Sequence, residues 1–145
     1  MPLTNPAYAY GGSVGPVSER GSIPSASILT LFTTPFQLLP APGAGAIILV
    51  DEIIFRLVFN SIAYAGANAL EMRYTNASGV KVTASDLANT FLNSASGTNY
   101  QTIDGVTTAF APVANAAVVA CVPTANPTAG NSVLDYLIRY HVVAF

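Results

Sequence analysis

The sequence predicts an all-β protein: a jelly-roll-like β-sandwich of about eight strands, with one short helix and an extended N-terminal arm. Apolar residues alternate with polar ones through several segments of strand length, and Pro, Gly and Asn separate these segments at intervals of about 8–12 residues. Apolar residues make up 52% of the 145 residues and charged residues only 8%, against roughly a quarter in ordinary soluble domains. The length predicts one sandwich domain, over residues 26–145.

The arm is expected to span residues 1–25. Pro and Gly are dense enough in Met1–Ser25 to oppose both a helix and a sheet ladder. Removing this segment is therefore expected to leave the sandwich folded. A flexible terminus is the commoner alternative. If the arm instead docks on a partner, its apolar anchors are Tyr8, Tyr10, Val14 and Ile23.

The strands are expected to begin directly after the arm. Ile28–Phe32 and Phe36–Leu39 are the first two, and the Pro- and Gly-rich segment Pro40–Gly45 makes a sharp turn. Ala46–Asn60 has a period of two over its length, which predicts a long strand with one buried face. It is expected to bend at Asp51-Glu52, with the two adjacent carboxylates on opposite faces.

The middle of the chain predicts a hairpin and the single helix. Leu70–Thr75 alternates cleanly and pairs with Val80–Thr83 across a four-residue loop. Ser85 is expected to cap the helix, and Ser94–Asn99 is expected to be a loop. Two short strands follow, at Thr107–Ala111 and Ala116–Val122.

The last strand, Ser132–Phe145, has one apolar face and one mixed face. The mixed face is too apolar for water and too polar for the core of a monomer, so we expect it to meet another subunit. Its candidate interface residues are Asp135, Arg139, His141 and Phe145.

Charge excludes several classes of partner. Five Lys/Arg and seven Asp/Glu give a net charge of −2, and scattered cations do not suit direct binding to nucleic acid or to a membrane surface. No apolar stretch is long enough to span a bilayer, and no signal peptide is expected. A single Cys and a single His exclude a Cys/His zinc site within one chain. A soluble protein from a reducing compartment is expected.

No catalytic, cofactor-binding or metal-binding residues are predicted. His141 is the only histidine, and its place in a strand suits an ion pair or an interface better than a catalytic triad. Asp86 and Asp104 lie in or beside loops that could approach each other, but carboxylates in loops more often cap turns. Gly43-Ala44-Gly45-Ala46 enters a strand instead of a helix, so it lacks the geometry of a phosphate-binding turn.

The low charge favours an obligate oligomer or a component of a larger assembly. Seven of the charged residues fall inside predicted strands, and two interpretations remain open. They form ordinary cross-strand pairs on a solvated face, or they fix the register between copies of the protein.

The segment Thr33–Ile48, TTPFQLLPAPGAGAII, followed by Ile62-Ala63-Tyr64, resembles small β-rich proteins of tailed-phage structural modules, over roughly residues 28 to 75. The resemblance implies a capsid cement or decoration protein without catalytic residues. Such a protein would be a homotrimer that is made in the host cytoplasm, binds the major capsid protein and stabilises the outer surface of the phage head. The alternative is a carbohydrate- or receptor-binding tail or fibre module, with a weak sugar platform at Tyr100, Gln101 and Asp104.

Overall fold

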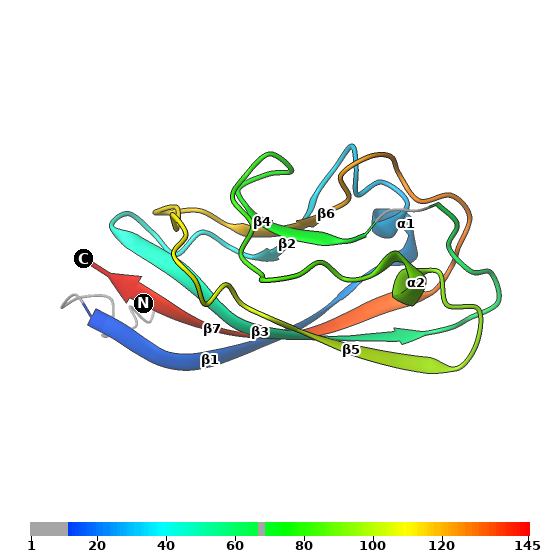
Figure 1. Ribbon diagram of the computed structural model, residues 1–145, viewed down its shortest axis with the longest axis horizontal. Coiled ribbons are helices and arrows are strands. Elements are labelled where there is room, and N and C mark those ends of the chain that lie inside the picture. Colours follow the sequence, from blue (N-terminus) through cyan, green and yellow to red (C-terminus); the bar gives the residue numbers. More distant parts are fainter. Residues whose placement is uncertain (1–11, 67–68) are drawn as a thin grey trace, which may run out of the picture.

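The computed structural model describes residues 12–66 and 69–145, which fold into two packed antiparallel sheets (Figure 1). The larger sheet has the strand order β1 (Gly12–Ile23), β7 (Val133–Ala144), β3 (Ala46–Val58) and β5 (Thr98–Asp104). The smaller sheet has the order β2 (Phe36–Leu39), β6 (Val118–Cys121) and β4 (Glu71–Tyr74). The helices, α1 (Ser25–Ile28) and α2 (Asn89–Leu92), have four residues each.

The topology is that of a jelly roll, because each successive strand lies in the opposite sheet and every pair is antiparallel. An eighth strand would lie beside β4, where residues 80–87 run instead. This segment runs antiparallel to β4 and its flank, to which it makes two isolated bridges, Arg73 to Lys81 and Leu70 to Leu87; a third bridge joins Thr83 to Gly105. The predicted all-β sandwich is confirmed.

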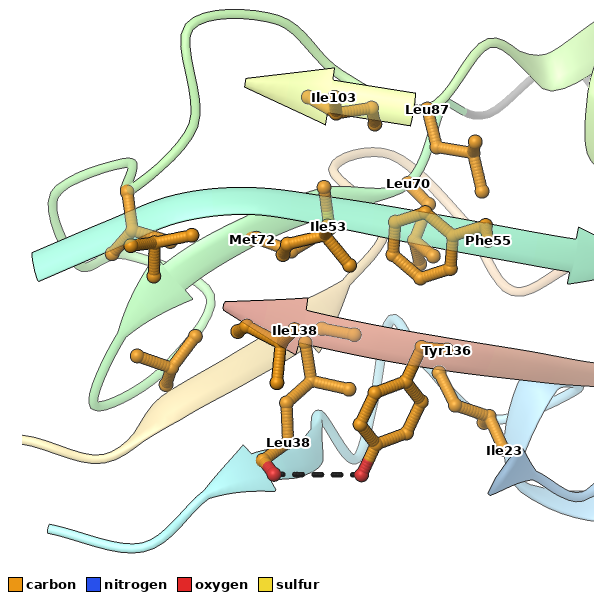
Figure 2. Close-up of a cluster of buried hydrophobic side chains, with 14 of the residues drawn as sticks. Ile23, Leu38, Ile53, Phe55, Leu70, Met72, Leu87, Ile103, Tyr136 and Ile138 are labelled. Carbon is orange, nitrogen blue, oxygen red and sulfur yellow. Dashed lines mark hydrogen bonds between the residues drawn. The ribbon is translucent and has the colours of Figure 1, made fainter. Parts of the chain in front are cut away.

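The core lies between the two sheets (Figure 2). Ile53 and Phe55 of β3 and Ile138 of β7 are fully buried, and Met72 of β4 packs against them from the smaller sheet. Burial of each such side chain stabilises the fold by about 1.5–3 kcal/mol. Tyr136 lies among them and its hydroxyl donates a hydrogen bond to the carbonyl of Leu38, 3.4 Å away, which ties the two sheets together.

The predicted boundary of the arm is wrong, because Gly12–Ile23 forms β1 at the edge of the larger sheet. Pro16 lies between Val14 and Val17, where the pairing of β1 with β7 is irregular. Pro16 is not paired with a residue of β7, so the ladder does not require the backbone N–H that proline lacks. Ile23, predicted as an anchor on a partner, is fully buried in the core of its own chain. The anchors Tyr8 and Tyr10 lie outside the described residues, and of Val14 only its backbone place in β1 is defined.

Gly21 of β1 packs directly against the ring of Tyr136. A Cβ built on Gly21 would lie 2.3 Å from the hydroxyl oxygen of Tyr136, so the tyrosine ring occupies the space of the missing side chain. Glycine at this position is a packing requirement of the sheet and not a sign of disorder.

Other predicted elements differ in type or place. Residues Ile28–Phe32 form the end of α1 and the turns after it, because the backbone N–H of Ile28 already bonds to the carbonyl of Pro24 in a helical turn. The second helix begins at Asn89, four residues after the expected cap Ser85. Thr107–Ala111 is not a strand, whereas β5 takes its first residues from the predicted loop Ser94–Asn99.

Candidate interaction surface

The candidate site is the outer face of the large sheet, which points away from the smaller sheet. Side chains alternate along each strand, so those between the core residues point outward. Strand pairing aligns them in rows that cross β1, β7, β3 and β5. The central rows are Ser22–Asp135–Arg56–Tyr100, Arg20–Leu137–Ile54–Thr102 and Ser18–Arg139–Glu52–Asp104.

A bulge in β3 places two adjacent carboxylates on this face. The register of β3 against β7 shifts between Val50 and Glu52, so Asp51 is the extra residue. Asp51 contacts His141 and Glu52 contacts Arg139, two residues that share one side of β7. The expectation that Asp51 and Glu52 point to opposite faces is therefore wrong.

Two ion pairs and one histidine–carboxylate contact cross from β3 to β7 on the outer face. The guanidinium of Arg56 lies 2.5 Å from the carboxylate of Asp135, and Arg139 lies 2.5 Å from Glu52. His141 Nδ1 lies 2.8 Å from Asp51. Each Arg side chain is about half exposed, so such pairs contribute little to stability in water.

Asp135 is the most restrained carboxylate of the face. The hydroxyl of Ser22 donates a hydrogen bond to it over 2.6 Å, and Arg56 donates from both Nε and Nη2. The hydrogen bond from Ser22 and the guanidinium of Arg56 hold the pKa of Asp135 below its ordinary value, against the opposing effect of partial burial. Asp135 thus stays ionised and fixes the Arg56 side chain across the sheet.

Two shallow depressions lie on the face, with different charge. The first, of about 550 Å³, is lined by Arg20, Arg56 and Tyr100 together with Asp135. The second, of about 470 Å³, has an acidic lining of Asp51, Glu52 and Asp104 beside Arg139 and His141. Among the residues that the structure describes, neither Arg20 nor Asp104 has a side-chain hydrogen bond or an ion pair.

Apolar side chains separate and flank the ion pairs. Ile54 and Leu137 are half-buried in the row between the Arg56 and Arg139 pairs. Val58 and Val133 lie opposite each other at the end of the face and are 43% and 42% exposed. These neighbouring aliphatic side chains offer exposed apolar area between charges that are already paired within the chain.

The structure brings three of the predicted interface residues together on this face: Asp135, Arg139 and His141. Phe145 follows β7, is 90% exposed, and donates its backbone N–H to the carbonyl of Gly45. The sequence did not single out Ile54 or Val58 as interface residues. Their alternation in β3 was visible, but the register that aligns them with β7 was not.

A second group of charges lies on the opposite side of the molecule, on the smaller sheet. The Glu71 carboxylate is nearly buried and accepts contacts from Arg73 at 2.7 Å and Lys81 at 2.8 Å. Burial raises the pKa of Glu71, but the hydrogen bonds from Arg73 and Lys81 outweigh it and hold that pKa below its ordinary value. Lys81 also contacts Asp86 at 2.9 Å. This cluster secures residues 80–87 to β4.

The described residues show no assembled metal site: nowhere in 12–66 or 69–145 do three His, Cys, Asp or Glu side chains gather around one point. Asp86, which the sequence placed near Asp104 as a possible partner, is instead held by Lys81. Over the same residues, no helix is long or apolar enough to cross a membrane.

Comparison with known proteins finds one solved structure of similar fold. No family model and no curated protein matches the sequence. A solved structure described as "Cyanophage Pam1 capsid asymmetric unit" contains a chain with a similar fold, at a TM-score of 0.51 and 18% sequence identity. The match covers 97% of this chain and 99% of that chain. At this identity the likeness defines a shared jelly-roll fold over the whole length of both chains.

Proposed function

We propose that this protein is a virion structural protein that binds the outer surface of a phage head as a cement or decoration protein. The observation that carries the proposal is the end-to-end fold match to a chain of a phage capsid unit. Two features of the chain support it independently. The segment Thr33–Ile48 resembles phage structural proteins, and 8% charged residues suit a protein whose surface is largely covered.

The proposed assembly is a homotrimer that contacts the major capsid protein and bridges neighbouring capsomers. Each contact is modest, and many copies acting together stabilise the shell against internal pressure. Residues 1–11, which precede β1, are proposed to reach the capsid, with Tyr8 and Tyr10 as apolar anchors. The protein is proposed to need no cofactor and to catalyse no reaction.

Particles that lack the protein provide the test. Purified protein is added back, and cryo-electron microscopy locates it while heating measures the release of DNA. Density over the head and a higher temperature of DNA release are expected. Density at the tail tip, with no change in head stability, would refute the cement function and favour the alternative of a receptor-binding tail or fibre module.

The alternative of a sugar-binding module finds less support in the site. Tyr100 is 66% exposed and shares the outer face with Asp104. Gln101 lies on the other side of β5 with the buried Ile103. The three residues therefore do not form one platform.

A further inference from the structure

We propose that the outer face of the large sheet binds the same face of a second copy, across a two-fold axis that runs along the strands between β3 and β7. The axis lies in the plane of contact, at the centre of the order β1-β7-β3-β5. It places β3 of one copy over β7 of the other, and β1 over β5. The inference stands on this face alone and does not depend on the capsid function.

The charges of the face complement themselves under this operation. Arg56 meets Asp135 of the second copy, and Glu52 meets Arg139 of the second copy, because each row pairs a cation with an anion across β3 and β7. Each of these side chains is already fixed by its partner within the chain, so association loses little further side-chain entropy. A two-fold contact of this kind is isologous, with one patch used by both copies.

The apolar residues follow the same pattern. Ile54 meets Leu137 of the second copy in the central row, and the exposed Val58 meets Val133 of the second copy. Packing of these aliphatic side chains removes apolar area from water at the middle and at one end of the face. The charged rows then alternate with apolar rows in both copies.

Arg20 and Asp104, which form no ion pair within residues 12–66 and 69–145, select between the possible axes. Arg20 lies on β1 and Asp104 on β5, at opposite edges of the sheet and in adjacent rows. With the axis along the strands, Arg20 lies one row, about 7 Å along the strand direction, from the position opposite Asp104 of the second copy, an offset that the long arginine side chain can span. An axis across the strands would place Arg20 beside Arg20 of the second copy, which is repulsive.

The available area suits a reversible dimer. Four strands about 4.8 Å apart, over about eight residues of β7, give a footprint of roughly 500 Å² for each copy. The total of about 1,000 Å² is the lower limit for a specific interface, so we expect dissociation on the order of micromolar concentrations. Twisted sheets pack with their strands within about 30° of each other, so the central rows carry the contact.

A charge exchange tests the interface without disturbing the fold. In the double variant Arg56→Asp with Asp135→Arg, the ion pair within the chain is kept with its sign reversed, and Ser22 can accept a hydrogen bond from the new guanidinium. Two copies of this variant remain complementary to each other. A variant copy and an unmodified copy oppose like charges at both positions, so the mixed contact should be repulsive.

Fluorescence-detected sedimentation velocity reads out the result. Labelled unmodified protein should sediment as an associated species in an excess of unlabelled unmodified protein. It should sediment as the unassociated species in an equal excess of the double variant. The double variant should associate with itself about as strongly as the unmodified protein does.

Ile54→Arg provides a second test at the centre of the face and should weaken association at least about tenfold. The matched control is Val80→Arg, at a residue that is 39% exposed and lies beyond the outer face, near the smaller sheet; it should leave association unchanged. Thermal melts establish that each variant is folded. Equal association of the mixture and of the unmodified protein, or association that Ile54→Arg leaves intact, would overturn the proposal. Loss of self-association by the folded double variant would refute the axis along the strands.

Discussion

Replacement of Ile23 by alanine tests whether β1 is part of the folded core. Ile23 is the last residue of β1, is fully buried, and packs in the cluster that contains Tyr136. Conversion of a buried isoleucine to alanine removes apolar contacts and leaves a cavity, at a cost of about 2–5 kcal/mol. The protein loses this stability only if β1 is packed in the folded core.

The expected change in melting temperature follows from the length of the chain. Unfolding entropy near 2 cal/mol/K per residue gives about 0.3 kcal/mol/K for this chain, so a loss of about 3 kcal/mol lowers Tm by about 10 °C. Differential scanning calorimetry or circular dichroism measures the shift. Val80→Ala, at a residue 39% exposed, is the matched control and should change Tm by less than about 2 °C.

Truncation extends the same test. Removal of residues 1–11 leaves β1 whole, so Tm should stay within about 2 °C of the full chain. Removal of residues 1–25 deletes β1, uncovers the backbone of β7 and should prevent cooperative folding. If Ile23→Ala and removal of residues 1–25 both melted like the full chain, the segment would be a dispensable arm and its place in the sheet would be refuted.

Three further predictions concern the smaller sheet and its loops. The folded-state pKa of Glu71 lies below the ordinary value of 4.5, so the stabilisation from its carboxylate is full above that value and is lost as pH falls through the folded-state pKa. Between neutral pH and about pH 3, the melting temperature should therefore fall more steeply for the unmodified protein than for Glu71→Gln. Equal slopes of melting temperature against pH would contradict this. Cys121 is fully buried and burial raises the pKa of its thiol, so a thiol reagent should react only on unfolding; rapid labelling of the native protein would show that β6 opens. Gly130 has a φ of +89°, and a Cβ at this position would lie 2.1 Å from the ring of Tyr64. Gly130→Ala should therefore lower the free energy of unfolding by more than about 1 kcal/mol, measured by denaturant titration. An unchanged midpoint would show that the loop readily moves.

The long strands were predictable because burial imposes a period of two on them. β7 carries a series of inward apolar residues over 12 residues, and β3 carries two such series that the bulge at Asp51 separates. β5 escaped prediction because Ile103 alone is buried among its residues. An edge strand with one buried side chain has almost no periodic signal, so its polar Thr and Asn residues read as a loop.

β1 escaped prediction for a different reason. Pro and Gly normally interrupt a ladder, but an edge strand has one unpaired side, and a bulge tolerates a missing N–H. Gly21 is required by the ring of Tyr136, a residue more than a hundred positions away in the sequence. Such tertiary requirements cannot be seen in the local composition.

The residues of the candidate surface on β7 could be predicted from the sequence, whereas their partners on β3 could not. The mixed face of the last strand identified Asp135, Arg139 and His141, because alternation along one strand is a local property. Their partners on β3 depend on register, and Asp135 contacts Arg56 across 79 positions of sequence. The bulge at Asp51 shifts that register by one residue, which no local pattern reveals.

The direction of the proposed two-fold axis matters for how a pair would sit on a shell. β1 begins and β7 ends at the same end of the large sheet, where Gly12 pairs with Ala144 (Figure 1). An axis along the strands keeps these ends together, so Gly12 of both copies lies at the same end of the pair. Local two-fold axes of an icosahedral shell stand normal to its surface, so such a pair would stand with its strands upright. Both Gly12 residues would then lie at the end nearer the capsid, or both at the end away from it. Homotrimers joined by these two-fold contacts would form a closed net over the head, whereas an axis across the strands would place the two Gly12 residues at opposite ends of the pair and at the same height above the surface.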